Sequence, residues 1–232
     1  MSFRAAIRVV LCATLLLTES CAGGRASPPR AALGPSADIA FEGEVLPVTR
    51  TPHDRVPPPR PENPSLGAQG APIVVQMWSD FECPFCADMQ PVLTELLQVY
   101  AGKVCLIWHD YPLPFHAHAR LAANAGREAF AQGGATAFWT FHDAVYTAPA
   151  PQLDAAGLEG FATKAGLDRA RFRSALSKSA HDSEINSDIS SGEALGVSGT
   201  PAFLVNDLFF VGSLPFGVLR VIVDRALADA GA

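Results

Sequence analysis

Two cysteines in the segment Cys83-Pro84-Phe85-Cys86 are the residues best suited to chemistry in this sequence. A thiolate is both a nucleophile and a metal ligand, so a pair at this spacing could exchange disulfides or form half of a zinc site. Zinc would need two further cysteine or histidine ligands. Cys105 falls in a predicted buried strand, and His116 and His118 should diverge on a helix, so we predict no metal site.

The elements around this pair should place it where a strand ends and a helix begins. The apolar run 73–78 predicts a buried strand, and residues 84–100 predict a helix, because proline suits the first helical turn. Unpaired N–H groups and the positive end of the helix dipole stabilise a thiolate at that point. We therefore predict that Cys83 is the nucleophile and that Cys86, one turn later, is the resolving thiol.

The region 71–232 predicts one α/β domain. A second buried strand at 104–108 makes a strand–helix–strand unit, which indicates a parallel pair. An all-helical insertion is expected over about 112–196, where runs rich in Ala and Leu alternate with glycine and proline breaks. Two short strands around a turn at Asn206-Asp207 and a closing helix complete a C-terminal ββα half.

The first residues predict export from the cytoplasm. Arg4 and Arg8 precede the apolar stretch 9–17, which is the pattern of a signal peptide over residues 1–20. We therefore expect the mature protein to lie in the periplasm or cell envelope, where disulfides can form.

Cys21 directly follows this apolar stretch, and the segment resembles the signal of bacterial lipoproteins. The resemblance implies that Cys21 is acylated and anchors the protein to a membrane. Thr18 and Glu19 depart from the lipoprotein pattern. The alternative is ordinary cleavage after Ala22, because Ser20-x-Ala22 also satisfies the preference for small residues.

Residues 21–70 are predicted to form a proline-rich linker that is largely disordered. The segment contains Pro57-Pro58-Pro59 and few side chains to bury, which favours extended polyproline conformations. An edge strand over 39–48 is the alternative for part of it. The whole chain of 232 residues is 49% hydrophobic with a net charge of −6, so it can bury a core but offers no basic surface for nucleic acid.

Three segments in this order resemble the DsbA-like class of thioredoxin-fold proteins, and in particular its exported BdbD-like branch. They are residues 80–86 around the cysteine pair, 111–119 before the helical insertion, and 196–206. The resemblance implies a thioredoxin-like fold in which Pro201 is cis and lies against the two cysteines. It also implies that the backbone of Thr200 pairs with an extended substrate segment.

Two positions depart from the pattern of that class. Met77 stands where thioredoxins and DsbA-type enzymes carry a buried carboxylate, and we expect Asp80 and Glu82 to face solvent rather than replace it. The active-site dipeptide Pro84-Phe85 has phenylalanine where DsbA has histidine, so the thiolate of Cys83 lacks one hydrogen bond. We therefore predict a reduction potential below the value of about −120 mV for DsbA, toward about −200 mV.

The sequence thus predicts an exported thiol–disulfide oxidoreductase that works through Cys83 and Cys86 without a cofactor. The resemblance implies exported protein substrates and a membrane redox partner. Two alternatives stay open: a tethered thioredoxin-fold module that binds a metal or a client without turnover, and a disulfide reductase or isomerase.

Several other residues have simpler explanations. Cys105 should behave as a small apolar residue, and hydrogen-bonded structural roles are expected for His109 and His142. We expect core packing rather than a peptide-binding surface for four aromatic residues: Phe115, Phe138, Trp139 and Phe141.

Overall fold

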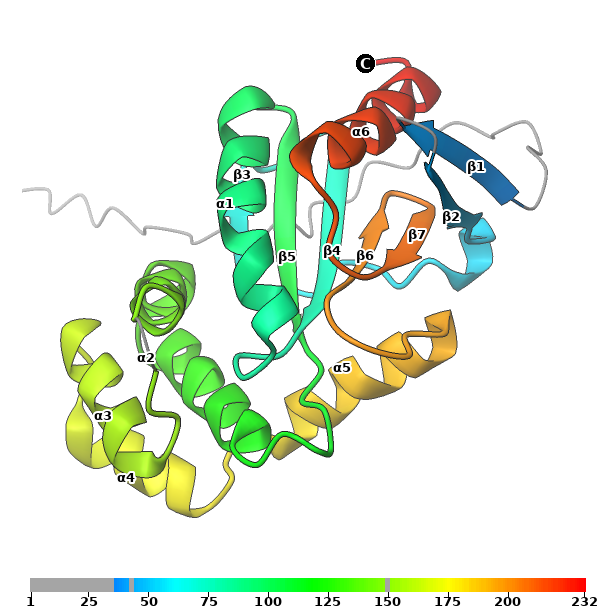
Figure 1. Cartoon of the computed structure of the whole chain (residues 1–232). Coiled ribbons are helices and arrows are strands. Elements are labelled where there is room, and N and C mark those ends of the chain that lie inside the picture. Colours follow the sequence, from blue (N-terminus) through cyan, green and yellow to red (C-terminus); the bar gives the residue numbers. More distant parts are fainter. Residues whose placement is uncertain (1–35, 42–43, 149–150) are drawn as a thin grey trace, which may run out of the picture.

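The computed structural model describes residues 36–41, 44–148 and 151–232 (Figure 1). The predicted export signal and Cys21 lie outside the described residues, so both stay predictions. Within the described ranges, every helix is too short or too polar to cross a membrane.

A mixed sheet of seven strands, in the order β1-β2-β7-β6-β4-β5-β3, forms the centre of the fold. Its central strands are β7 (Leu208–Val211), β6 (Ala202–Val205), β4 (Ile73–Ser79) and β5 (Val104–Asp110). β4 runs parallel to β5, and α1 (Pro84–Val99) joins them, which confirms the predicted strand–helix–strand unit. The predicted hairpin at Asn206-Asp207 is also confirmed, because β6 and β7 pair antiparallel around it. The side chains of β5 are buried throughout, as expected for a strand with both faces covered.

Both edges of the sheet are made by the segment expected to be a linker. Its elements are β1 (Ser36–Phe41), β2 (Glu44–Arg50), the 3-10 helix η1 (His53–Arg55) and β3 (Ser65–Gly67). β2 pairs with β7, and β3 pairs with β5. The prediction of a largely disordered linker over 21–70 is therefore wrong where the structure describes it. The physical reason is that β7 and β5 offer unpaired backbone groups, which a short extended segment satisfies without a large apolar face of its own.

The helical insertion lies between β5 and β6, as predicted. Its helices are α2 (Ala119–Tyr146), α3 (Ala155–Lys164), α4 (Arg169–Ser177) and α5 (Asp182–Leu195). α2 is broken at Gly133 and at Gly134, whose φ of 64° favours glycine. Figure 1 shows α2 at the end of the sheet where α1 begins, and α6 (Phe216–Ala230) over the sheet near its opposite end.

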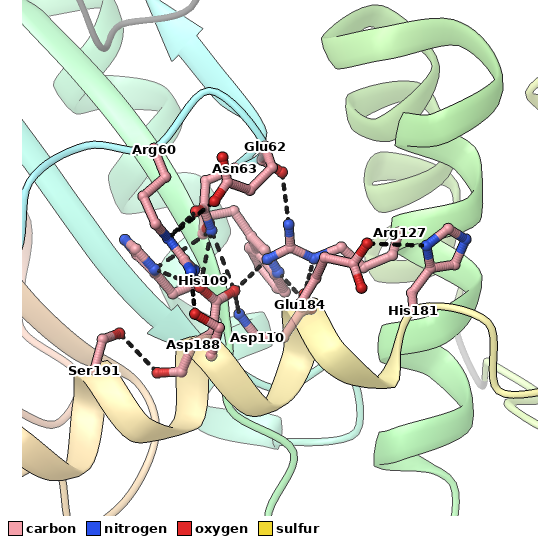
Figure 2. A network of polar contacts seen from close by, with 12 residues as sticks. Arg60, Glu62, Asn63, His109, Asp110, Arg127, His181, Glu184, Asp188 and Ser191 are labelled. Atoms are coloured by element: carbon pink, nitrogen blue, oxygen red, sulfur yellow. Dashed lines mark hydrogen bonds and ion pairs between the residues drawn. The ribbon is translucent and has the colours of Figure 1, made fainter.

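A buried network of charged and polar side chains joins this insertion to the sheet (Figure 2). At its centre is Asp188 of α5, whose side chain is 0% exposed. Burial alone would raise the pKa of Asp188, but His109 and Arg127 outweigh it and lower this pKa to about 2. The groups that contact the Asp188 carboxylate are Asn63, His109, the backbone N–H of Asp110, Arg60 and Arg127.

Candidate active site

Cys83 is the N-cap residue of α1, and Pro84 is the first residue of the helix. The strand β4 ends four residues earlier, so the chain turns sharply before the helix and brings the Cys83 sulfur to its amino end. When it is protonated, its thiol donates a hydrogen bond to the backbone oxygen of Thr200, with 3.3 Å between sulfur and oxygen. The sulfur therefore lies between the start of α1 and the segment that precedes β6.

The two thiols differ strongly in acidity. A hydrogen bond from Cys86 is the largest cause that lowers the pKa of Cys83, to about 5, against burial, which raises it. The nearby Thr200 side chain and the backbone N–H groups at the start of the helix lower this pKa further. Burial raises the pKa of Cys86, which is 0% exposed. At neutral pH the site therefore holds a thiolate at Cys83 and a neutral thiol at Cys86.

The peptide bond between Thr200 and Pro201 is cis, as the resemblance implied. Thr200 is buried, and its hydroxyl oxygen has no hydrogen-bond partner of acceptable geometry among the described residues. The loop after β7 lies next to both halves of the site, because Gly212 N–H donates to Pro201 O (2.7 Å) and Ser213 Oγ donates to Phe85 O (3.0 Å).

Asp80 lies inside the protein, so the expectation that it faces solvent is wrong. Its carboxylate accepts hydrogen bonds from the N–H groups of Glu82 (2.8 Å) and Leu113 (2.9 Å), and it contacts His116 Nδ1 at 2.7 Å. An aspartate that binds the N–H two residues later is a turn signature, and this signal could have revealed the role of Asp80 before Cys83. Glu82 is part-exposed, and its carboxylate accepts a hydrogen bond from His118 N–H (2.7 Å).

His116 and His118 do not lie on a helix, contrary to expectation. α2 begins at Ala119 with His118 as its N-cap, and His116 precedes it in the loop held by Asp80. Within the parts of the chain that the structure describes, no group of three or more His, Cys, Asp or Glu side chains is arranged to hold a metal.

The remaining sequence expectations have mixed outcomes. Phe138, Trp139 and Phe141 are buried, which confirms core packing, but Phe115 is 76% exposed and does not belong to the core. His109 and His142 are buried and hydrogen-bonded, as predicted. Cys105 is buried in β5 but disulfide-bonded, so the expectation that it acts only as a small apolar residue is wrong.

The fold and the site together define a class of protein. Its members have a mixed sheet in which a helix joins two parallel strands, and a pair of cysteines at the start of that helix lies beside a loop with a cis proline. A family model described as thioredoxin matches residues 60–225. The chain belongs to the thioredoxin family, and the predicted thioredoxin-like fold with a helical insertion is confirmed.

Solved structures with the same fold include a thioredoxin-like oxidoreductase from Silicibacter pomeroyi. It is 25% identical, with a TM-score of 0.66 over 73% of this chain and 94% of that chain. The oxidised form of BdbD from Bacillus subtilis is 20% identical, with a TM-score of 0.65 over 72% of this chain and 94% of that chain. The likeness to BdbD shows a shared fold.

Among curated proteins, the chain is similar to part of Na(+)/H(+) antiporter NhaA 3 of Salinispora tropica. The two are 36% identical over 165 residues, which is 71% of this chain and 24% of the antiporter. NhaA of Herminiimonas arsenicoxydans is 31% identical over 171 residues, which is 73% of this chain and 27% of that protein. The chain spans about a quarter of the length of these curated relatives, and their name describes the whole proteins.

Proposed function

We propose that this protein is an extracytoplasmic thiol–disulfide oxidoreductase that exchanges disulfides with exported proteins through Cys83 and Cys86. One observation carries the proposal: the Cys83 sulfur lies at the start of α1, 3.3 Å from the backbone oxygen of Thr200 before a cis proline, and the buried thiol of Cys86 follows one turn later. In this setting the pKa of Cys83 is lowered to about 5. A stable thiolate is both the attacking and the leaving form in disulfide exchange. Cys83 is therefore the sulfur that meets the substrate, and Cys86 is the sulfur that releases it.

In the oxidising direction, a substrate thiolate attacks the Cys83 sulfur of the Cys83–Cys86 disulfide. The bond between the two cysteines breaks, its electron pair stays on Cys86, and Cys86 takes up a proton. A second substrate thiolate then attacks the substrate sulfur in the mixed disulfide, and Cys83 leaves as a thiolate. The low pKa of Cys83 favours this last step, because a more acidic thiol is a better leaving group.

The surface around Cys83 supports an extended, partly apolar polypeptide as substrate. Phe85 is 59% exposed and belongs to the active-site dipeptide. Phe115 is 76% exposed and precedes His116, which contacts the turn before Cys83. Exposed apolar side chains of this kind can mark a site of protein interaction. Thr200 and cis Pro201 are proposed to align the substrate backbone beside Cys83.

An extracytoplasmic location is part of the proposal. It is supported by the export pattern at 1–20 and by the fold shared with a periplasmic thioredoxin-like protein from Salmonella enterica, which is 24% identical with a TM-score of 0.59. We further propose anchoring through acylated Cys21, and re-oxidation of the reduced pair by a membrane partner. Mass spectrometry of the mature N-terminus tests the anchor, because an unmodified N-terminus after Cys21 would contradict it.

The activity is tested by refolding of reduced ribonuclease with wild-type protein, Cys83→Ser and Cys86→Ser. We expect Cys83→Ser to lose activity by at least about a hundredfold, because the attacking sulfur is gone. Cys86→Ser should instead accumulate a mixed disulfide between Cys83 and the substrate, visible on non-reducing gels. Refolding at the wild-type rate by Cys83→Ser would refute the proposal.

A further inference from the structure

Ser79, the last residue of β4, lies close enough to the buried Cys86 thiol to affect its acidity. It is 1% exposed, and its hydroxyl oxygen has no hydrogen-bond partner of acceptable geometry among the described residues. The hydroxyl nevertheless lies near both the Cys86 thiol and the Tyr146 phenol, and it lowers the pKa of each. A buried hydroxyl without a fixed partner is costly, so its position calls for an explanation.

Tyr146 of α2, the second neighbour of the Ser79 hydroxyl, is fixed by its own contacts. Its hydroxyl donates to the backbone oxygen of Asp80 (3.1 Å), and its ring stacks on Phe81 with 5.6 Å between centroids. Because the phenol hydrogen is used in that bond, the phenol oxygen is left as an acceptor. The Ser79 hydroxyl can thus donate its hydrogen to either of two acceptors, the Tyr146 oxygen or the Cys86 sulfur.

None of the titratable groups found beside Cys86 carries a positive charge that could stabilise a thiolate there. The titratable groups that face it are Cys83, Tyr146 and Asp80. Burial keeps the pKa of Tyr146 well above 10, so the phenol stays neutral. The Asp80 carboxylate is engaged elsewhere, by the groups named above, and only its backbone reaches Cys86. A negative charge on the buried Cys86 sulfur therefore depends on neutral donors.

We infer that the Ser79 hydroxyl donates a hydrogen bond to the Cys86 sulfur whenever that sulfur is negatively charged, and turns to the Tyr146 oxygen when Cys86 is protonated. This inference rests on the proposed function. In the resolving step, the Cys86 thiolate attacks Cys83 in a mixed disulfide. The Cys83–Cys86 bond forms, the bond from Cys83 to the substrate breaks, and the substrate sulfur leaves with the electron pair and gains the proton that Cys86 lost.

The same hydrogen bond acts when the reaction runs the other way. A substrate thiolate that attacks Cys83 expels Cys86 with a negative charge, so Ser79 stabilises the same developing thiolate. In the two resting states, Cys86 is either a neutral thiol or part of a disulfide. Ser79 should therefore speed both directions equally and leave the equilibrium between dithiol and disulfide almost unchanged.

The test uses the full protein with glutathione as the probe. We expect Ser79→Ala to slow glutathione attack on the oxidised protein and resolution of the Cys83–glutathione mixed disulfide by at least about tenfold each, the lower end for a hydrogen bond to a charged group. The redox equilibrium constant with glutathione should change less than about twofold. A general packing defect would not slow both directions and spare the equilibrium.

Two further variants complete the test. Ser191→Ala is the matched control, because it removes a part-buried hydroxyl that contacts Trp78, the strand neighbour of Ser79, and both rates should stay at the wild-type value. Tyr146→Phe removes the second acceptor and should leave the Ser79 hydroxyl on Cys86, so its rates should not fall as far as those of Ser79→Ala. Wild-type rates in Ser79→Ala would overturn the inference, whereas wild-type protein that forms no mixed disulfide at Cys83 would overturn the proposed function instead.

Discussion

At the scale of single residues, the acidity of Cys83 depends on two parts of the chain. One is the start of α1, through the Cys86 thiol and the backbone N–H groups, and the other is the side chain of Thr200. The pKa of about 5 lies between the values of about 3.5 for DsbA and about 7 for thioredoxin. Phe85 donates nothing from its side chain, which agrees with a site less acidic than that of DsbA.

The acidity of Cys83 should be visible in its reactivity. The rate of alkylation of the reduced protein by iodoacetamide should rise with pH around a midpoint near 5, with one reactive cysteine at pH 7. Thr200→Val should move the midpoint upward by about one unit, because the nearby hydroxyl that lowers the pKa of Cys83 is removed, whereas Thr200→Ser should keep it. An unchanged midpoint in Thr200→Val would show that its hydroxyl does not reach the sulfur.

The same pKa links the redox site to stability. Because the pKa of Cys83 is lower in the folded reduced protein than its ordinary value of 9.0, ionisation stabilises the folded reduced state. This stabilisation is fully present above the ordinary pKa and is lost as the pH falls through about 5. Reduced protein should thus lose stability relative to oxidised protein when acidified, and melting temperatures of both forms across this range measure the effect.

At the scale of elements, α5 is held to the sheet by Asp188. Its carboxylate contacts Arg60 and Arg127 and pairs with His109 (Figure 2), and of these side chains only Arg60 is part-exposed. Removal of one partner from a buried ion network leaves the other charges without compensation. Such a network fixes where the helical insertion lies relative to the cysteine pair.

Asp188→Ala should lower the free energy of unfolding by about 3–5 kcal/mol, because the buried Arg127 and the part-exposed Arg60 each lose an anionic partner. Urea unfolding of the oxidised protein measures it. Asp182→Ala on the same helix is the control, since its ion pair with Arg120 is exposed and should contribute less than about 1 kcal/mol. Equal losses in the free energy of unfolding for the two variants would show that Asp188 does not hold α5 to the sheet.

At the scale of the whole molecule, residues before the predicted domain start belong to the fold. Pro57 O accepts a hydrogen bond from Gln76 Nε2 (2.8 Å), and Ser65 O accepts one from Trp139 Nε1 (2.8 Å). Asn63 donates to Trp108 O (2.8 Å) within the buried network. The segment from η1 to β3 therefore closes the β5 edge and completes the contacts of Asp188.

A protein that starts at residue 71 should melt about 10 °C or more below the full chain, because it loses β3 together with two partners of Asp188. A protein that starts at residue 57 is the control, since it loses β1, β2 and η1 but keeps the network. Calorimetry of the three proteins gives the comparison. If the protein that starts at residue 71 melts at the same temperature as the protein that starts at residue 57, β3 and the network contribute little to stability.

The site and the central elements could be predicted from the sequence because their signals are local. The spacing of Cys83 and Cys86, the apolar runs of β4 and β5, and the proline at the start of α1 each act within a few residues. The direction of the acidity difference follows from the same helix geometry.

Other features depend on contacts between residues far apart in the chain. Asp80 is buried because Leu113 and His116 return to it, and a proline-rich segment forms edge strands because β5 and β7 leave backbone groups unpaired. No short stretch of sequence carries such contacts. The position and identity of the reactive pair were thus determined locally. The contribution of Thr200 to the acidity of Cys83, and the burial of Ser79 and Asp80, were decided only by the tertiary structure, since burial is a property of the packed chain.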